Sequence, residues 1–144
     1  MYPAYSEPLG KAMSLCIQNR FSELKGSDFL VPVPKHPEEI VNGCNQAEKL
    51  TDVVSSILEL PAINVLTKVG PVKMKSLTSR SSRKESVKGL YEVHNSAPLE
   101  NKQAILIDDV TTSGSTASEC AQVLLNIGAK MINVVVAGRD VFVD

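Results

Sequence analysis

Cysteines, aromatic residues and long apolar runs are scarce in this chain, and each shortage excludes a class of protein. Its 144 residues include three cysteines without a CxxC pair, which argues against a disulfide framework and against a structural zinc site. No apolar run approaches the roughly 20 residues of a membrane-spanning helix. The first residues, MYPAYSEPLGKAM, lack the basic, apolar and small-residue order of a signal peptide. We therefore expect a cytoplasmic protein without membrane contact, whose cysteines are small buried or half-buried side chains: Cys16, Cys44 and Cys120.

Charge is nearly balanced over the whole chain but is concentrated in one segment. The formal net charge is -1, yet residues 73–88 hold six lysines and arginines against one glutamate, which gives this segment +5. Such a segment either meets an anionic partner or is solvated. It contains no aromatic side chain on which a base could stack, so nucleic acid is disfavoured as a partner without being excluded.

Hydrophobic periodicity predicts an α/β protein with a mostly parallel sheet flanked by helices, in one domain that covers residues 1–144. Residues from about 70 to 86 lack any period and are expected to form a flexible basic loop. The expected helices occupy 8–24, a segment that Asn45 caps and Pro61 stops, and a segment after 114 that Gly128 closes. The expected strands occupy 28–34, 62–69, 87–94, 104–107 and 131–138, with a turn at 108–114.

The segment 104–116, AILIDDVTTSGST, carries the chemistry that the sequence suggests. In open α/β sheets, ligands bind beyond the carboxyl ends of the strands, which is where this turn falls. Asp108 and Asp109 can accept hydrogen bonds from paired sugar hydroxyls. Backbone N–H groups and hydroxyls at the start of the next helix suit a phosphate. A diol beside a phosphate indicates a ribose 5-phosphate, held in part by Thr111, Thr112, Ser113, Gly114, Ser115 and Thr116.

A simpler interpretation gives this segment no ligand. Asp108 and Asp109 could cap a turn while the serines and threonines merely start a helix, as such residues often do. The joint occurrence of two acids, a hydroxyl-rich turn, a glycine and an apolar helix after a buried strand favours the phosphate site. The sequence holds neither the GxxxxGK[ST] pattern of a P-loop nor the GxGxxG pattern of a dinucleotide site.

Two motifs extend this interpretation to a family. The segment 104–116 is similar to the phosphoribosyl-pyrophosphate motif of type I phosphoribosyltransferases, in which two acids precede a TTSGST-like loop. Residues 31–50, VPVPKHPEEIVNGCNQAEKL, resemble the VPVP, H, RGFNQAE pattern of the ComF-like subgroup, which is related to competence proteins and amidophosphoribosyltransferases. With RKESVKGLY at 83–91, the resemblance covers most of the chain from residue 5 to residue 139. It implies the Rossmann-like type I phosphoribosyltransferase fold.

The resemblance also implies a reaction and its site. The chain would bind 5-phosphoribosyl-1-pyrophosphate with Mg²⁺, which the substrate pyrophosphate would hold in the main, and transfer the phosphoribosyl group to an unidentified nitrogenous acceptor. Asp108 and Asp109 would hold the ribose hydroxyls, and Thr111 to Thr116 would surround the 5-phosphate. Lys35 and His36 would contact pyrophosphate. Catalysis would rest on cations that neutralise the leaving group, namely Lys35, Arg80, Arg83 and Lys84.

Departures from the family pattern keep a second function open. Asn42 and Cys44 replace an arginine and an aromatic residue, and an asparagine expected near Ser86 is missing. These losses suit a regulator that binds phosphoribosyl pyrophosphate or a nucleotide without catalysis, or an accessory protein of DNA uptake. Thr112 stands where purine-salvage members carry an acid, which disfavours a 6-oxopurine acceptor. We expect no metal ligands among the side chains, and type I relatives are often homodimers.

Overall fold

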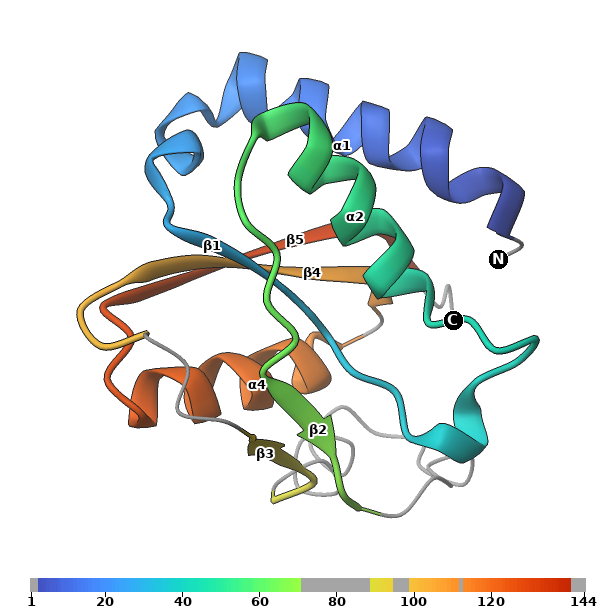
Figure 1. Ribbon diagram of the computed structural model, residues 1–144, viewed down its shortest axis with the longest axis vertical. Coiled ribbons are helices and arrows are strands. Elements are labelled where there is room, and N and C mark those ends of the chain that lie inside the picture. The colour runs from blue at the N-terminus through green and yellow to red at the C-terminus, as the bar shows by residue number, and fades with distance from the viewer. Residues whose placement is uncertain (1–2, 71–88, 95–98, 112, 141–144) are drawn as a thin grey trace.

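A computed structural model describes residues 3–70, 89–94, 99–111 and 113–140 of the chain (Figure 1). A parallel sheet lies between two helical layers. Helices α1 (Ser6–Arg20) and α2 (Gln46–Leu58) cover one face, and α4 (Ser115–Asn126) covers the other. The expected α/β architecture with a parallel sheet flanked by helices is confirmed. Three short 3-10 helices also occur in the described part of the chain: Pro3–Tyr5, Ser22–Gly26 and Pro37–Glu39.

Three strands form the central sheet, in the order β1-β4-β5. They are β1 (Phe29–Pro32), β4 (Gln103–Thr111) and β5 (Met131–Arg139), and both pairings are parallel. Parallel strands buried under helices on both faces need apolar residues on both sides, which explains the runs FLVP, AILI and INVVVA.

The strand expected at 62–69 is divided between two partners. Its beginning lies beside β1, where Ala62 forms a parallel bridge with Leu30. Its end, β2 (Leu66–Lys68), pairs antiparallel with β3 (Tyr91–Val93) in a separate two-stranded unit. This pair lies next to α4, at the end of the sheet where β1 and β4 finish (Figure 1). The expectation of one continuous strand at 62–69 was therefore wrong.

Strand β4 sorts its side chains onto two faces by the alternation of a pleated strand. Ile105 and Ile107 pack with residues of α1 and α2 in one core cluster. Ala104 and Leu106 belong to the other cluster, with α4 and the β2-β3 pair. All four side chains are fully buried. The polar residues that follow on β4 also point alternately to the two faces of the sheet.

Several local expectations can now be compared with the structure. Asn45 caps α2, as expected, because its side chain accepts a hydrogen bond from the N–H of Ala47. Cys44 and Cys120 are buried, but Cys16 is exposed, so the expectation for that cysteine was wrong. Within the described ranges, no helix is both long and apolar enough to cross a membrane.

Gly10 of α1 packs directly against Val53 of α2. A Cβ atom placed at Gly10 would lie 2.6 Å from two carbons of Val53, closer than side chains pack. Alanine in an exposed helix position stabilises relative to glycine by about 1 kcal/mol, but here overpacking reverses the sign. We expect Gly10→Ala to lower the free energy of unfolding by about 1–3 kcal/mol, measured by urea denaturation. Gly26→Ala is the control, because an added Cβ there meets no atom within 4 Å.

Candidate functional site

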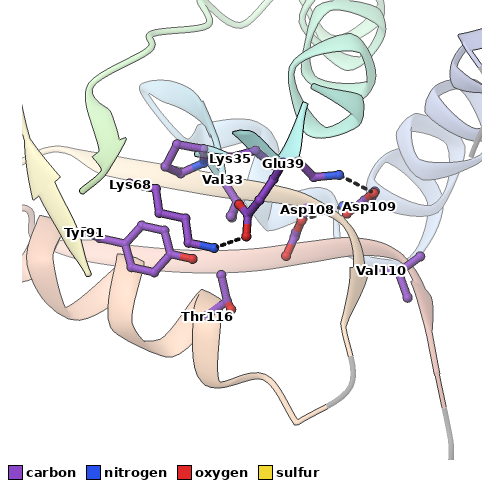
Figure 2. Close-up of a pocket in the computed structure, with 10 residues that line it drawn as sticks. Val33, Lys35, Glu39, Lys68, Tyr91, Asp108, Asp109, Val110 and Thr116 are labelled. Carbon is purple, nitrogen blue, oxygen red and sulfur yellow. Dashed lines mark hydrogen bonds and ion pairs between the residues drawn. The ribbon is translucent and has the colours of Figure 1, made fainter. Parts of the chain in front are cut away.

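A cavity of about 310 Å³ opens at the carboxyl ends of β1 and β4 (Figure 2). The loop after β1, the end of β4, the first turn of α4 and the β2-β3 pair all contribute to its wall. This is the place where open α/β sheets bind ligands. Five of the side chains that line it carry a formal charge, and two more bear hydroxyls: Lys35, Glu39, Lys68, Asp108, Asp109, Tyr91 and Thr116.

The two aspartates lie within β4, which continues to Thr111, and the expected turn at 108–114 was therefore placed too early. Strand alternation then separates them. Asp108 follows Leu106 on the face of α4 and Tyr91, whereas Asp109 follows Ile107 on the face of α2. Asp108 is only 7% exposed, and its Oδ1 accepts a hydrogen bond from the backbone N–H of Asp109 at 2.9 Å.

These environments drive the two pKa values apart. Burial raises the pKa of Asp108 to about 7, helped by the neighbouring carboxyl group of Asp109 through its side-chain interaction and its charge, whereas the backbone N–H of Asp109 acts in the opposite direction. Burial also acts to raise the pKa of Asp109, but hydrogen bonds from Asp108 and Val110 and the Lys35 cation outweigh it and lower the pKa. The pair therefore shares one proton near neutral pH, with the negative charge on Asp109.

Lys35 meets Asp109 from the loop after β1. Its Nζ lies 3.7 Å from Asp109 Oδ2, and the side chains are 33% and 16% exposed. The sequence placed Lys35 among the pyrophosphate contacts, and the structure brings it to the aspartate pair in the same cavity. A partly solvated ion pair of this kind has a small interaction energy, so it can exchange its partner for a ligand.

A second ion pair, which the sequence analysis missed, lines the opposite side of the cavity. Lys68, at the end of β2, places its Nζ 2.6 Å from Glu39 Oε1, and its side chain is 7% exposed. The same Nζ lies 6.0 Å from the ring centre of Tyr91. Figure 2 shows both lysines directed at the cavity from different elements. A lysine in the apolar run INVLTKV was the available signal, since a strand buries alternate positions.

Tyr91 closes the cavity next to α4. Burial raises its pKa above the ordinary range of tyrosine. Cys120, one turn further along α4, is also buried, and burial raises the pKa of its thiol. Both groups therefore stay neutral at physiological pH, and the charged groups of the cavity remain the lysines and the carboxylates.

Gly114 and two serine hydroxyls lie at the start of α4, where the sequence predicts a phosphate site. Gly114 immediately precedes α4 in the left-handed conformation, at φ 78°, which glycine adopts without strain. The hydroxyls of Ser113 and Ser115 are 2.7 Å apart. Thr116, in the first helical turn, faces the cavity. Thr111 ends β4 without contributing to the cavity wall.

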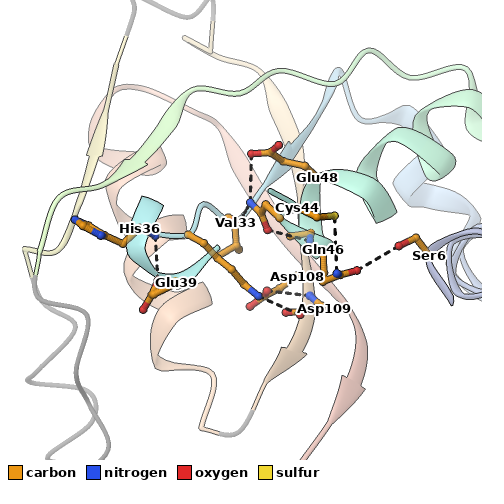
Figure 3. Close-up of polar contacts among 12 residues, drawn as sticks. Ser6, Val33, His36, Glu39, Cys44, Gln46, Glu48, Asp108 and Asp109 are labelled. Atoms are coloured by element: carbon orange, nitrogen blue, oxygen red, sulfur yellow. Dashed lines mark hydrogen bonds and ion pairs between the residues drawn. The ribbon is translucent and has the colours of Figure 1, made fainter. Parts of the chain in front are cut away.

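Among the described candidates, His36 does not line the cavity. The Nδ1 of His36 accepts a hydrogen bond from the backbone N–H of Glu38 and caps the short helix that follows. Figure 3 shows the imidazole directed away from Asp108 and Asp109, and a pyrophosphate contact for His36 stays a prediction. Thr112 and the basic residues Arg80, Arg83 and Lys84 lie outside the described residues.

The raised pKa of Asp108 predicts a measurable pH dependence. The folded state holds a proton that the unfolded chain releases, so the stability due to Asp108 is full below the unfolded pKa, 3.8, and is lost as pH rises to about 7. The amide introduced by Asp108→Asn cannot ionise. We expect the free energy of unfolding of this variant to rise relative to the unmodified protein between pH 5 and 8, by on the order of 2 kcal/mol. Urea denaturation across this range measures the difference, and a constant difference would contradict the assignment.

Comparisons with known proteins agree with this geometry. No protein-family model matches the chain. Competence protein F of Haemophilus influenzae is 28% identical over 133 residues, which cover 88% of this chain and 57% of that protein. The DNA utilization protein YhgH of Escherichia coli K12 is 29% identical over 93 residues, which cover 64% of this chain and 40% of that protein. The chain thus spans little more than half the length of the first relative.

Solved structures establish the fold. The glutamine phosphoribosylpyrophosphate amidotransferase of Bacillus subtilis has a TM-score of 0.62 at 19% identity, over 94% of this chain and 26% of that chain. The adenine phosphoribosyltransferase of Saccharomyces cerevisiae has a TM-score of 0.61 at 15% identity, over 96% of this chain and 70% of that chain. The resemblance drawn from the two sequence motifs is confirmed. The chain is similar to ComF-like proteins and has the fold of the type I phosphoribosyltransferases.

Proposed function

We propose that the chain binds 5-phosphoribosyl-1-pyrophosphate with Mg²⁺ and transfers the phosphoribosyl group to a nitrogenous acceptor. The observation that carries this proposal is the aspartate pair at the end of β4. The pair lines a cavity together with two lysines, Lys35 and Lys68, and a serine-rich turn at the start of α4 follows it along the chain. A phosphate site, diol acceptors and cations for a diphosphate would therefore follow one another in the order of the ligand's own groups.

Each part of the ligand has a partner in this arrangement. The 5-phosphate would bind at the turn before α4, where backbone N–H groups and the positive end of the helix dipole favour an anion. The ribose hydroxyls would donate to Asp109, the more acidic carboxyl. Asp108, protonated in part near neutral pH, can both donate and accept. The pyrophosphate would take Lys35 and Lys68 from their present carboxylate partners.

The cavity also suits a magnesium ion that arrives with the ligand. Mg²⁺ prefers oxygen ligands, keeps several water molecules and binds mainly through substrate phosphates. The carboxylates of Glu39 and Asp109 could accept hydrogen bonds from such water molecules. Bound Mg²⁺ would neutralise charge on the diphosphate.

Loss of pyrophosphate from C1 leaves an oxocarbenium-like ribose, so the protein must stabilise the leaving group and exclude water. Lys35 and Lys68 would supply positive charge at the departing diphosphate. Arg80, Arg83 and Lys84 remain proposed catalytic cations. The acceptor is unidentified, and Thr112 in place of an acid disfavours a 6-oxopurine.

The decisive experiment is a test of turnover. The protein, phosphoribosyl pyrophosphate and Mg²⁺ are incubated with a panel of acceptors that includes ammonia, amines, pyrimidines and purines. Release of pyrophosphate that depends on both protein and acceptor is the expected result. Isothermal titration with the same substrate measures binding separately. Tight binding without release from any acceptor would overturn the catalytic part of the proposal and leave the binding part.

A second candidate function rests on the relatives' names. Competence protein F and DNA utilization protein YhgH are named for DNA uptake and use. The chain would then serve as an accessory protein in which phosphoribosyl pyrophosphate or a nucleotide acts as a regulatory ligand. Specific binding of the ligand without pyrophosphate release, together with a defect in DNA use on deletion of the gene, would favour this candidate.

A further inference from the structure

We infer that Asn45 is a positioning residue for Lys35. Its side-chain amide fixes the loop after β1, and so sets the place of the lysine against the end of β4. The consequence for ligand binding rests on the proposed function. The positioning itself is a property of the free protein and can be measured without a ligand.

Asn45 is 4% exposed, and both ends of its amide are used. Oδ1 accepts the N–H of Ala47 at 3.1 Å, which caps α2. Nδ2 donates to the backbone oxygen of Val33 at 3.1 Å and to Glu48 Oε1 at 3.3 Å. Figure 3 shows Val33 and Glu48, the two residues to which Nδ2 donates. The Asn45 side chain therefore connects the first turn of α2 to Val33 in the cavity wall.

Val33 is held from two sides through this contact. Its N–H donates to the oxygen of Ile107 at 2.9 Å, and its oxygen accepts from Asn45 at 3.1 Å. Ile107 directly precedes the aspartate pair. Asn45 thus sets the direction in which the chain leaves β1, relative to the strand that carries Asp108 and Asp109.

Lys35 lies between this fixed point and a second one. Pro34, which separates it from Val33, has a restricted φ and no N–H of its own. On the other side, the N–H of His36 donates to Glu39 Oε2 at 3.0 Å. Two fixed peptide groups therefore flank Lys35, and its backbone has little freedom between them. Loss of the Val33 contact would release one side.

Capping alone would give Asn45 a purely structural role, and the two roles can be separated. A cap needs only the acceptor Oδ1, which serine and threonine replace well. The contact with Val33 needs the donor Nδ2, which neither residue can supply at that reach. Asn45→Ser keeps the cap and stays neutral, so it removes the positioning contact selectively. Asn45→Thr fills more volume and replaces it if the serine variant does not fold.

The primary test is a pH titration of the Asp109 carboxyl carbon by NMR in the unmodified protein and in Asn45→Ser. Lys35 helps to lower the pKa of Asp109, so displacement of Lys35 raises that pKa. Glu48→Ala is the matched control, because it removes the exposed partner of Nδ2 and leaves the Val33 contact. We expect a raised pKa of Asp109 in Asn45→Ser and an unchanged one in Glu48→Ala. A thermal unfolding scan checks that each variant is folded.

Affinity for phosphoribosyl pyrophosphate with Mg²⁺ gives a second readout, for which we expect a loss of about tenfold in Asn45→Ser. An unchanged pKa of Asp109 in a folded Asn45→Ser or Asn45→Thr overturns the inference, even if the melting temperature falls, because capping then explains the residue. If the unmodified protein does not bind the ligand, the proposed function fails, and the titration still decides the role of Asn45.

Discussion

Exchange of both aspartates for asparagine is expected to abolish measurable binding of phosphoribosyl pyrophosphate. Asp109 would accept a charge-assisted hydrogen bond from a ribose hydroxyl, which contributes about 1.5–3 kcal/mol, and the partly protonated Asp108 would form a second hydrogen bond with the diol. The single exchanges Asp108→Asn and Asp109→Asn should each weaken binding by about 10- to 100-fold. Asp109→Asn should have the larger effect, since Asp109 carries the negative charge of the pair. Isothermal titration with Mg²⁺ present measures the affinities.

Asp52→Asn is a suitable control for charge, because Asp52 is exposed on α2 and outside the cavity wall. It should bind the ligand as the unmodified protein does. The stability of Asp108→Asn matters as well, since its expected gain at neutral pH would accompany its loss of binding. A double variant that is folded and retains full affinity would remove the basis for the ribose site.

Removal of the buried cation is the second change with a large expected effect. Lys68→Met should weaken the binding of phosphoribosyl pyrophosphate by at least about 30-fold. The bound diphosphate would lose the buried cation that pairs with its negative charge. Ribose 5-phosphate lacks the diphosphate, so its affinity should change little. The ratio of the two affinities therefore isolates the diphosphate subsite. A parallel loss for both ligands would place Lys68 outside that subsite.

Stability must be separated from binding in this experiment. Lys68→Met leaves Glu39 without its cation, and the unpaired carboxylate, 23% exposed, destabilises the fold. Adding Glu39→Gln removes that charge and should restore stability but not diphosphate affinity. Lys11→Met is the matched control, because Lys11 forms an exposed ion pair with Glu7. It should leave both affinities unchanged.

The sequence was sufficient for the features that depend on local patterns. Apolar runs predicted the buried parallel strands, and Asn45 was identified as the cap of α2 from its place before an amphipathic run. The segment 104–116 combined a strand, two acids and a turn, so its place at the end of a central strand could be predicted. Each of these features depends on residues that are close to one another in the sequence.

Features that depend on distant pairings were beyond a local pattern. The pairing of β2 with β3 joins segments on either side of residues 71–88, and it brings Lys68 to Glu39 from 29 positions away. The polar residues after Ile107 indicated a turn, and the sequence pattern could not reveal that β4 continues to Thr111. That extension follows from the pairing of β4 with β5. The division of the aspartates between two faces depends on this extension.

Because the two aspartates face opposite sides of the sheet, the site is sensitive to the number of residues in β4. In a strand, an inserted residue turns every following side chain to the other face, because the side-chain period is two. An insertion between Ile107 and Asp108 would turn Asp108 toward α2 and Asp109 toward α4. Each carboxyl would then meet the environment of the other, with its net charge unchanged. The residue types around this strand could therefore vary more freely than the number of residues before the aspartates. A one-residue insertion in β4 would disrupt the site more than many substitutions.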